Sequence, residues 1–122
     1  MSTARRQLLG LAAAAGSSPV WAQVTPARIA EQSAQLNAFL DAEYEVALLR
    51  DPEDLTSQGR KERYGELTDR TEAAQDRELA WQRASVARMK ARFDPDTLNE
   101  DARTSYEVWA LELDRAEKSR TW

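Results

Sequence analysis

The sequence predicts an all-α protein, a small helical bundle of three main helices plus one short helix that follows an amino-terminal signal peptide. Residues that favour helices, namely Glu, Ala, Arg, Leu and Gln, dominate the composition. Only four Gly and four Pro occur among 122 residues, which leaves little room for the turns of a β-protein. No segment carries the signature of a strand, whereas several segments repeat apolar residues at helical spacing.

The first main helix is expected over residues 27–50, where apolar residues recur on one face: Ile29, Leu36, Leu40, Tyr44 and Ala47. Asp51-Pro52 ends this helix, because a residue before proline avoids the α conformation. The same pair begins the short helix, predicted at Pro52–Gln58, with Asp51 as its amino-terminal cap. Gly59 then ends it in a left-handed conformation.

A charged loop over Arg60–Leu67 leads to the second main helix, predicted at about 70–93. Asp69 and Glu72 have the spacing of a capping box that opens this helix. Asp94-Pro95 breaks it, and Asn99 caps the last helix. That helix has an apolar face at steps of three and four: Ala102, Tyr106, Trp109, Leu113 and Ala116.

Residues 1–22 are expected to be a signal peptide and not part of the fold. A basic pair, Arg5-Arg6, precedes the short apolar run Leu8–Ala15, and small residues end at Ala22. The pattern from Arg5 to Leu9 is typical of a twin-arginine signal, although an ordinary secretory signal fits the same residues. We therefore expect a periplasmic or secreted protein whose residues 23–122 fold, without a stable membrane anchor, because the apolar run is too short to span a bilayer.

Composition excludes several kinds of chemistry. The chain has no Cys and no His, which removes disulfides, thiolates, the commonest general base and the commonest zinc ligand. Its net charge is −4, and loss of Arg5 and Arg6 would make the remainder more acidic. An acidic surface repels phosphate backbones, so we expect no nucleic-acid partner.

Three pieces of the chain, in order, carry a family resemblance. They are the helix end and turn over Leu36–Gly59, the loop and helix start over Tyr64–Thr71, and Phe93-Asp94 followed by Leu98–Asp101 and Tyr106. Together they resemble the amino-terminal region of the bacterial domain-of-unknown-function 885 family, over about residues 36–117. Its members are similar to zinc metallopeptidases that are exported, all-helical and several times longer than this chain.

The resemblance implies that this chain is the N-terminal helical scaffold portion of an exported zinc-metallopeptidase-like hydrolase. In such proteins the zinc motif, a His-Glu-x-x-His-like helix, lies far downstream, so zinc is expected only in a carboxyl-terminal part beyond this chain. No catalytic, cofactor-binding or metal-binding residue is carried over. The implied partners are the remainder of the same polypeptide and a peptide substrate of the parent protein.

The end of the sequence leaves two interpretations open. The last helix has no glycine cap before Trp122, which favours a truncated chain that belongs to a larger domain. The alternative is a small self-contained periplasmic helical protein that binds a partner through an exposed apolar face. A stand-alone enzyme is disfavoured, because neither His nor Cys is present.

Three groups of residues could form a site, and each also has a simpler interpretation. The carboxylates of Asp41, Glu43 and Glu45 could bind a hard cation or act as an acid and base pair, but a solvated helix face is the simpler interpretation. A basic cluster could bind a carboxylate or phosphate, but pairing with Glu53, Asp54 and Glu62 is the simpler interpretation; its members are Arg60, Lys61, Arg63 and Tyr64.

Trp81 and Trp109 could stack on a sugar or a peptide, but their helical spacing favours a place in the core or an interface. A Ser–Lys nucleophile would need a buried lysine, and the three lysines all lie among charges: Lys61, Lys90 and Lys118.

Overall fold

The computed structural model describes residues 24–121, and every element in that range is helical. The expected signal peptide over 1–22 and the terminal Trp122 lie outside the described residues. The elements are α2 (Pro26–Arg50), α3 (Pro52–Ser57), α4 (Glu72–Arg92), the 3₁₀ helix η2 (Pro95–Thr97) and α5 (Glu100–Thr121). The predicted all-α class, with three long helices and a short one, is confirmed.

The ends of α2 and α3 follow the predicted signals closely. Thr25 caps α2 by accepting a hydrogen bond from the Arg28 N–H at 3.2 Å, and the helix begins one residue before the predicted start. The Asp51 carboxylate accepts from the Asp54 N–H at 3.1 Å, so it caps α3 as predicted. Gly59 has φ +82°, the left-handed conformation expected after that helix.

The predicted start of α4 was wrong by two residues. The Thr71 hydroxyl, and not Asp69, accepts the capping hydrogen bond, from the Ala74 N–H at 3.2 Å. The Asp69 carboxylate instead accepts from the Thr71 N–H at 3.0 Å, which forms a turn just before the helix. Both side chains can cap, and the helix begins at the residue that the preceding turn presents.

The break between α4 and α5 contains a short element that the sequence did not predict. Asp94 accepts from the Asp96 N–H at 3.0 Å and opens η2, while the Thr97 hydroxyl donates to the Asp94 carbonyl at 2.7 Å. Asn99 caps α5 as predicted, since its side-chain oxygen accepts from the Ala102 N–H at 2.8 Å.

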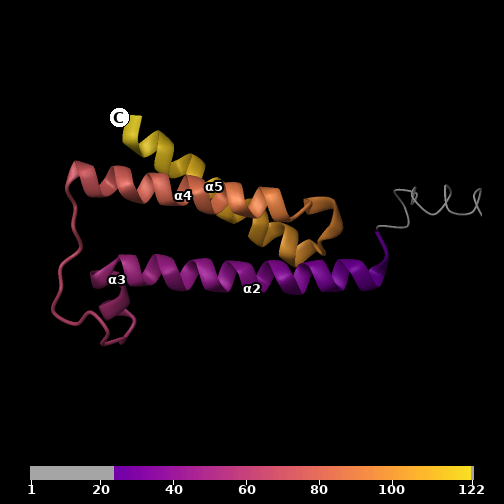
Figure 1. Cartoon of the computed structure of the whole chain (residues 1–122), viewed down its shortest axis with the longest axis horizontal. Coiled ribbons are helices and arrows are strands. Elements are labelled where there is room, and N and C mark those ends of the chain that lie inside the picture. The colour runs from indigo at the N-terminus through magenta and orange to yellow at the C-terminus, as the bar shows by residue number, and fades with distance from the viewer. Residues whose placement is uncertain (1–23, 122) are drawn as a thin grey trace, which may run out of the picture.

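The core lies toward the η2 end of the molecule, where α2, α4 and α5 meet (Figure 1). Its buried side chains come from all three helices and from the η2 connection: Leu36, Val86, Met89, Phe93, Leu98, Ala102 and Tyr106. The buried Ser33 hydroxyl accepts from the Asn99 N–H at 2.9 Å, which ties α2 to the start of α5.

The helices separate away from this core. Figure 1 shows α5 starting beside α2 and leaning toward α4 along its length. Two ion pairs hold the carboxyl-terminal part of α5 to α4, Arg83–Glu117 at 3.0 Å and Arg120–Asp76 at 2.5 Å. At this other end Leu48, Leu55, Ala74 and Leu79 are buried as well, and Arg50 of α2 pairs with Glu78 of α4 at 2.7 Å. Two hollows remain between α2, α3 and the α4–α5 pair, and we call this the open end.

Candidate docking groove at the open end

The open end holds a hollow of about 420 Å³, which we call the aromatic hollow. It receives side chains from α2, α3, α4 and α5: Tyr44, Ala47, Asp54, Trp81, Gln82, Val86, Trp109, Glu112 and Leu113. Aromatic and aliphatic groups make up most of this wall, with a few polar groups between them. Such a composition is typical of a surface that receives another molecule or another helix.

The two tryptophans of the aromatic hollow are half-buried and held in place by their neighbours. The Trp109 indole N–H donates to the fully buried Ser85 hydroxyl at 2.9 Å. The Arg50 guanidinium lies 5.5 Å from the centre of the Trp81 ring and is itself paired with Glu78 at 2.7 Å. Both rings therefore line the hollow in fixed orientations, between the core and the solvent.

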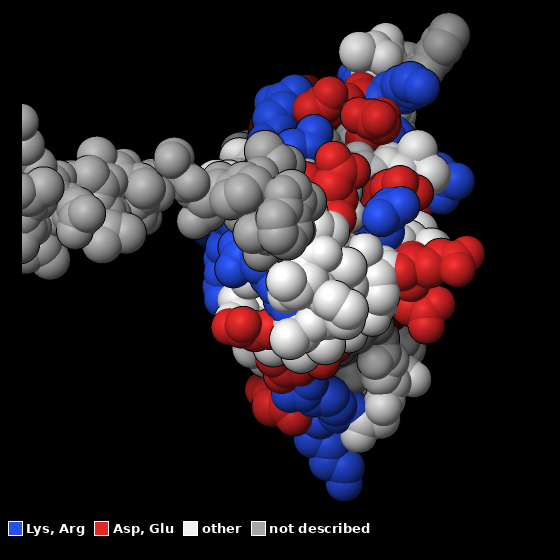
Figure 2. All heavy atoms as spheres, turned by 90° about the vertical axis from the view of Figure 1, so that its right-hand side faces the viewer, with Lys and Arg blue, Asp and Glu red and all other residues white. Residues whose placement is uncertain are grey.

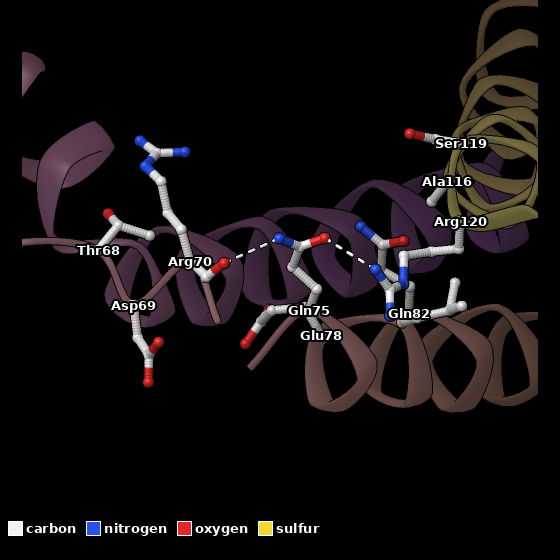
Figure 3. A pocket seen from close by; sticks show the side chains of 10 residues that line it. Thr68, Asp69, Arg70, Gln75, Glu78, Gln82, Ala116, Ser119 and Arg120 are labelled. Atoms are coloured by element: carbon white, nitrogen blue, oxygen red, sulfur yellow. Dashed lines mark hydrogen bonds between the residues drawn. The ribbon is translucent and has the colours of Figure 1, made fainter. Parts of the chain in front are cut away.

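A second hollow of about 300 Å³, the polar hollow, lies between α4, α5 and the loop before α4. Most of the residues that line it are of polar type: Thr68, Asp69, Arg70, Gln75, Glu78, Leu79, Gln82, Ala116, Ser119 and Arg120. Figure 3 shows Gln75 between two of these residues. The Arg70 carbonyl accepts from the Gln75 amide at 2.9 Å, and the Gln75 oxygen accepts from Arg120 at 3.0 Å.

Gln82 lines both hollows, so the polar hollow adjoins the aromatic hollow, which is the candidate docking groove. Its side-chain oxygen is buried and has no hydrogen-bond partner among residues 24–121. The Arg120 Nε is also buried without a partner there. Unpaired buried polar groups are costly, and both atoms are covered by the surrounding side chains, so neither is open to an occupant of the hollows.

The ionisable side chains of the aromatic hollow are acidic, apart from the Tyr44 phenol. Asp54 projects from α3 and Glu112 from α5, on different walls. Glu112 pairs with the exposed Arg115 at 3.0 Å, whereas no ion pair within the described part of the chain includes Asp54. At the opposite end of the molecule, which faces the viewer in Figure 2, positive and negative side chains are interspersed.

The three carboxylates that could have formed a cation site or an acid and base pair have separate surroundings. Glu43 pairs with Arg88 at 2.8 Å, Glu45 pairs with Arg60 at 2.6 Å, and Asp41 is exposed. The Arg60 hydrogen bond lowers the pKa of Glu45, so this carboxyl stays ionised. No group of three or more acidic residues in the range 24–121 is placed to hold a metal ion.

The basic cluster fastens the loop to α2 and does not form an anion site. Arg60 contacts Glu45 and also Glu62 at 2.7 Å, and Arg63 donates to the Leu49 carbonyl at 2.7 Å. The predicted pairing with Glu62 is confirmed. The predicted pairing with Glu53 is wrong, since Arg70 takes that carboxylate at 2.9 Å.

The remaining members of the cluster, Lys61 and Tyr64, are exposed. The predicted pairing of the cluster with Asp54 is wrong, since no ion pair among the described residues includes this carboxylate. Lys90 and Lys118 are exposed as well, so no lysine of the described range has the burial that a Ser–Lys nucleophile needs.

Sequence reasoning identified Trp81 and Trp109 but missed the rest of the groove. Gln82 gave no signal, because a glutamine on a helix usually faces solvent. Tyr44 and Leu113 were assigned to apolar faces, and only the separation of the helices shows that these faces are partly uncovered. Asp54 was predicted to pair with the basic cluster of the loop, and its position in the wall of the aromatic hollow does not follow from sequence spacing alone.

Comparison of the chain with protein-family models, curated proteins and solved structures finds no significant match. The resemblance to the domain-of-unknown-function 885 family therefore stays a prediction. Within residues 24–121, every helix is too short or too polar to be a membrane-spanning segment.

Proposed function

We propose that this chain is the N-terminal helical scaffold of an exported, zinc-metallopeptidase-like hydrolase. In this proposal the groove at the open end receives a further helix of the same polypeptide. The observation that carries the proposal is the position of the aromatic hollow, which lies where three long helices separate although their other ends share a buried core. One more helix at that place would complete a four-helix arrangement.

The energetic case rests on the half-buried aromatic and aliphatic side chains of the hollow. Covering the exposed part of one such half-buried side chain contributes about 1 kcal/mol. Trp81, Trp109 and Leu113 together would therefore contribute about 3 kcal/mol, which is a large fraction of the stability of a small domain.

The scaffold role also agrees with the chemistry that the chain lacks. The sequence has no His or Cys, and the described carboxylates are engaged in ion pairs or dispersed. We derive no catalytic step from these residues. In the proposal they position machinery that is encoded further along the gene, and the signal-like segment over 1–22 exports the whole product.

The experiment that tests the proposal is to sequence the gene beyond the codon for Trp122. We expect an open reading frame that continues into a helix with a His-Glu-x-x-His-like zinc motif. A stop codon directly after Trp122 would contradict the proposal.

A second candidate function is a self-contained exported protein that binds a separate partner through the same groove. The closed core, with Leu36 and Met89 completely buried, favours it, because the three helices already share a packed interior. A stop codon after Trp122, together with cooperative thermal unfolding of the monomer, would support this candidate over the first.

A further inference from the structure

We infer that the helix which fills the groove is amphipathic, with lysine or arginine side chains on both flanks of its apolar stripe. This inference rests on the proposed function, because it names the chemistry of the helix that the groove receives. It follows from three features of the aromatic hollow: the sign of its charges, the kind of its hydrogen-bonding groups and the nature of its aromatic rings.

The charged side chains that line the aromatic hollow are both acidic. Asp54 and Glu112 approach the hollow from α3 and from α5, and no basic residue lines it. A helix lying between these walls would place one flank near each carboxylate. Basic flanks would pair with both walls, whereas acidic flanks would bring like charges together, which is unfavourable at an interface.

The hydrogen-bonding groups that an occupant can reach have the same preference. Asp54 and Glu112 are exposed, whereas the Gln82 oxygen is covered by its neighbours. The Tyr44 phenol oxygen already accepts from the Gln58 amide at 3.2 Å. Lysine and arginine carry only donors, so they can pair with both carboxylates without adding a new unpaired acceptor.

The rings of the hollow suit the apolar stripe of a docking helix. The Arg50 guanidinium, which is paired with Glu78, already lies 5.5 Å from the centre of the Trp81 ring, so the docking helix need not supply a cation there. Trp109 lies in the same wall, with its indole N–H directed to Ser85. The apolar stripe of the docking helix would cover these rings, and its basic flanks would extend past their edges to the acidic walls.

A second copy of this chain is a poorer occupant. The chain carries a net charge of −4, and most of its arginines along the described helices are already held in ion pairs, among them Arg83, Arg88 and Arg115. Docking a second copy would bring two molecules of negative net charge together, which is unfavourable at an interface.

The test uses the full chain and two labelled model peptides of about 18 residues, each with leucine at helical spacing. The flanking positions are all lysine in one peptide and all glutamate in the other, and binding is measured by fluorescence anisotropy. We expect the lysine peptide to bind at least about tenfold more tightly than the glutamate peptide.

Matched variants separate the groove from general attraction to an acidic protein. Asp54→Asn with Glu112→Gln removes the two groove charges, and Asp41→Asn with Glu107→Gln removes two exposed charges elsewhere. The groove pair should weaken binding of the lysine peptide about tenfold, and the control pair less than about twofold. Circular dichroism checks that both double variants keep the helical content of the parent chain.

The inference is overturned if both peptides bind equally, or if the two double variants weaken the lysine peptide to the same degree. Sedimentation that shows a dimer in which the groove variants dissociate would overturn it in favour of a second copy. The proposed function is tested by a different result. A reading frame that ends at Trp122 would contradict the scaffold proposal but would leave the preference for a basic peptide intact. Equal binding of the two peptides would contradict that preference but would leave the scaffold proposal intact.

Discussion

At the scale of single residues, Asp51 and Thr68 hold the junction between α2, α3 and the following loop. The Thr68 hydroxyl donates to the Asp51 carboxylate at 2.5 Å, and the same carboxylate caps α3 by accepting from the Asp54 N–H. The Thr68 hydroxyl also accepts from the Glu53 N–H at 3.2 Å. One threonine therefore connects a helix start to a loop that lies 17 residues away from Asp51 in sequence.

The pKa of Asp51 gives this junction a pH dependence. The hydrogen bond from Thr68 is the main cause that lowers this pKa, and partial burial opposes it. A carboxyl with a lowered pKa in the folded state stabilises the fold above its unfolded pKa, and this contribution is lost as the pH falls through the folded value.

We therefore expect the loss of stability in Asp51→Asn to be greatest near pH 6 and to shrink as the pH falls below about 4. Urea unfolding of the parent chain and the variant across this range measures the difference. A difference that stays constant down to about pH 2.5 would show that the ionised Asp51 carboxylate is not the stabilising group.

A second residue-scale prediction concerns the support of Trp109. Ser85 is completely buried, and its hydroxyl accepts the Trp109 indole hydrogen bond. Ser85→Ala leaves that N–H without its partner and should lower the free energy of unfolding by about 1 kcal/mol. Ser105→Ala is the control, since the exposed Ser105 hydroxyl contacts only the Asp101 carbonyl of its own helix. Equal losses in the two variants would contradict the support that we assign to Ser85.

At the scale of elements, the turn after α3 depends on the backbone of Gly59. Its φ of +82° is unfavourable for a side chain, and an added Cβ at this position would meet nothing within 4 Å. Gly59→Ala should therefore lower stability by about 1 kcal/mol through the backbone alone. The neighbouring Gln58→Ala should change it by less than about 0.5 kcal/mol in thermal or urea unfolding. An unchanged stability in Gly59→Ala would show that this turn can form in another conformation.

The elements that sequence could predict are those fixed by local chemistry. Apolar spacing identified α2, α4 and α5, and Asp51-Pro52 and Asn99 located two helix starts because capping acts over three residues. The start of α4 was missed, since Asp69 and Thr71 are both able to cap. Arg60 pairs with Glu62 and Glu45, and only the pairing with Glu62 was predicted. Glu45 approaches Arg60 across a chain reversal that local spacing does not reveal.

The candidate groove was less predictable than the helices. Periodicity places Trp81 and Trp109 on helix faces, but it does not give the angle at which α5 leaves α2. That angle, visible in Figure 1, decides whether an apolar face is covered. The unpaired Gln82 oxygen likewise depends on packing between α4 and its neighbours and has no sequence signal.

At the scale of the whole molecule, the structure has a packed end and an open end. Met89 belongs to the core and is completely buried, whereas Leu113 lines the groove and is only partly buried. Met89→Ala should cost about 2–5 kcal/mol because it leaves a cavity. Leu113→Ala should cost about 1 kcal/mol, since solvent already reaches its site. Equal losses in equilibrium unfolding would contradict this division of the molecule.

The same division predicts where the fold opens most easily. Local opening needs the least free energy where few apolar contacts form, so the parts of α4 and α5 beside the groove should open before those in the core. A docked helix would raise the free energy of opening beside the groove toward that of the core, because it would supply the missing apolar contacts.

Native-state hydrogen exchange, measured amide by amide on the chain with and without the lysine peptide, tests this claim most directly. Alone, residues 75–82 and 112–119 should exchange through local opening, whereas residues 86–92 and 103–109 should exchange only through global unfolding. The peptide should raise protection in the first set to a greater degree than in the second. Uniform protection along both helices in the free chain, unchanged by the peptide, would contradict the account.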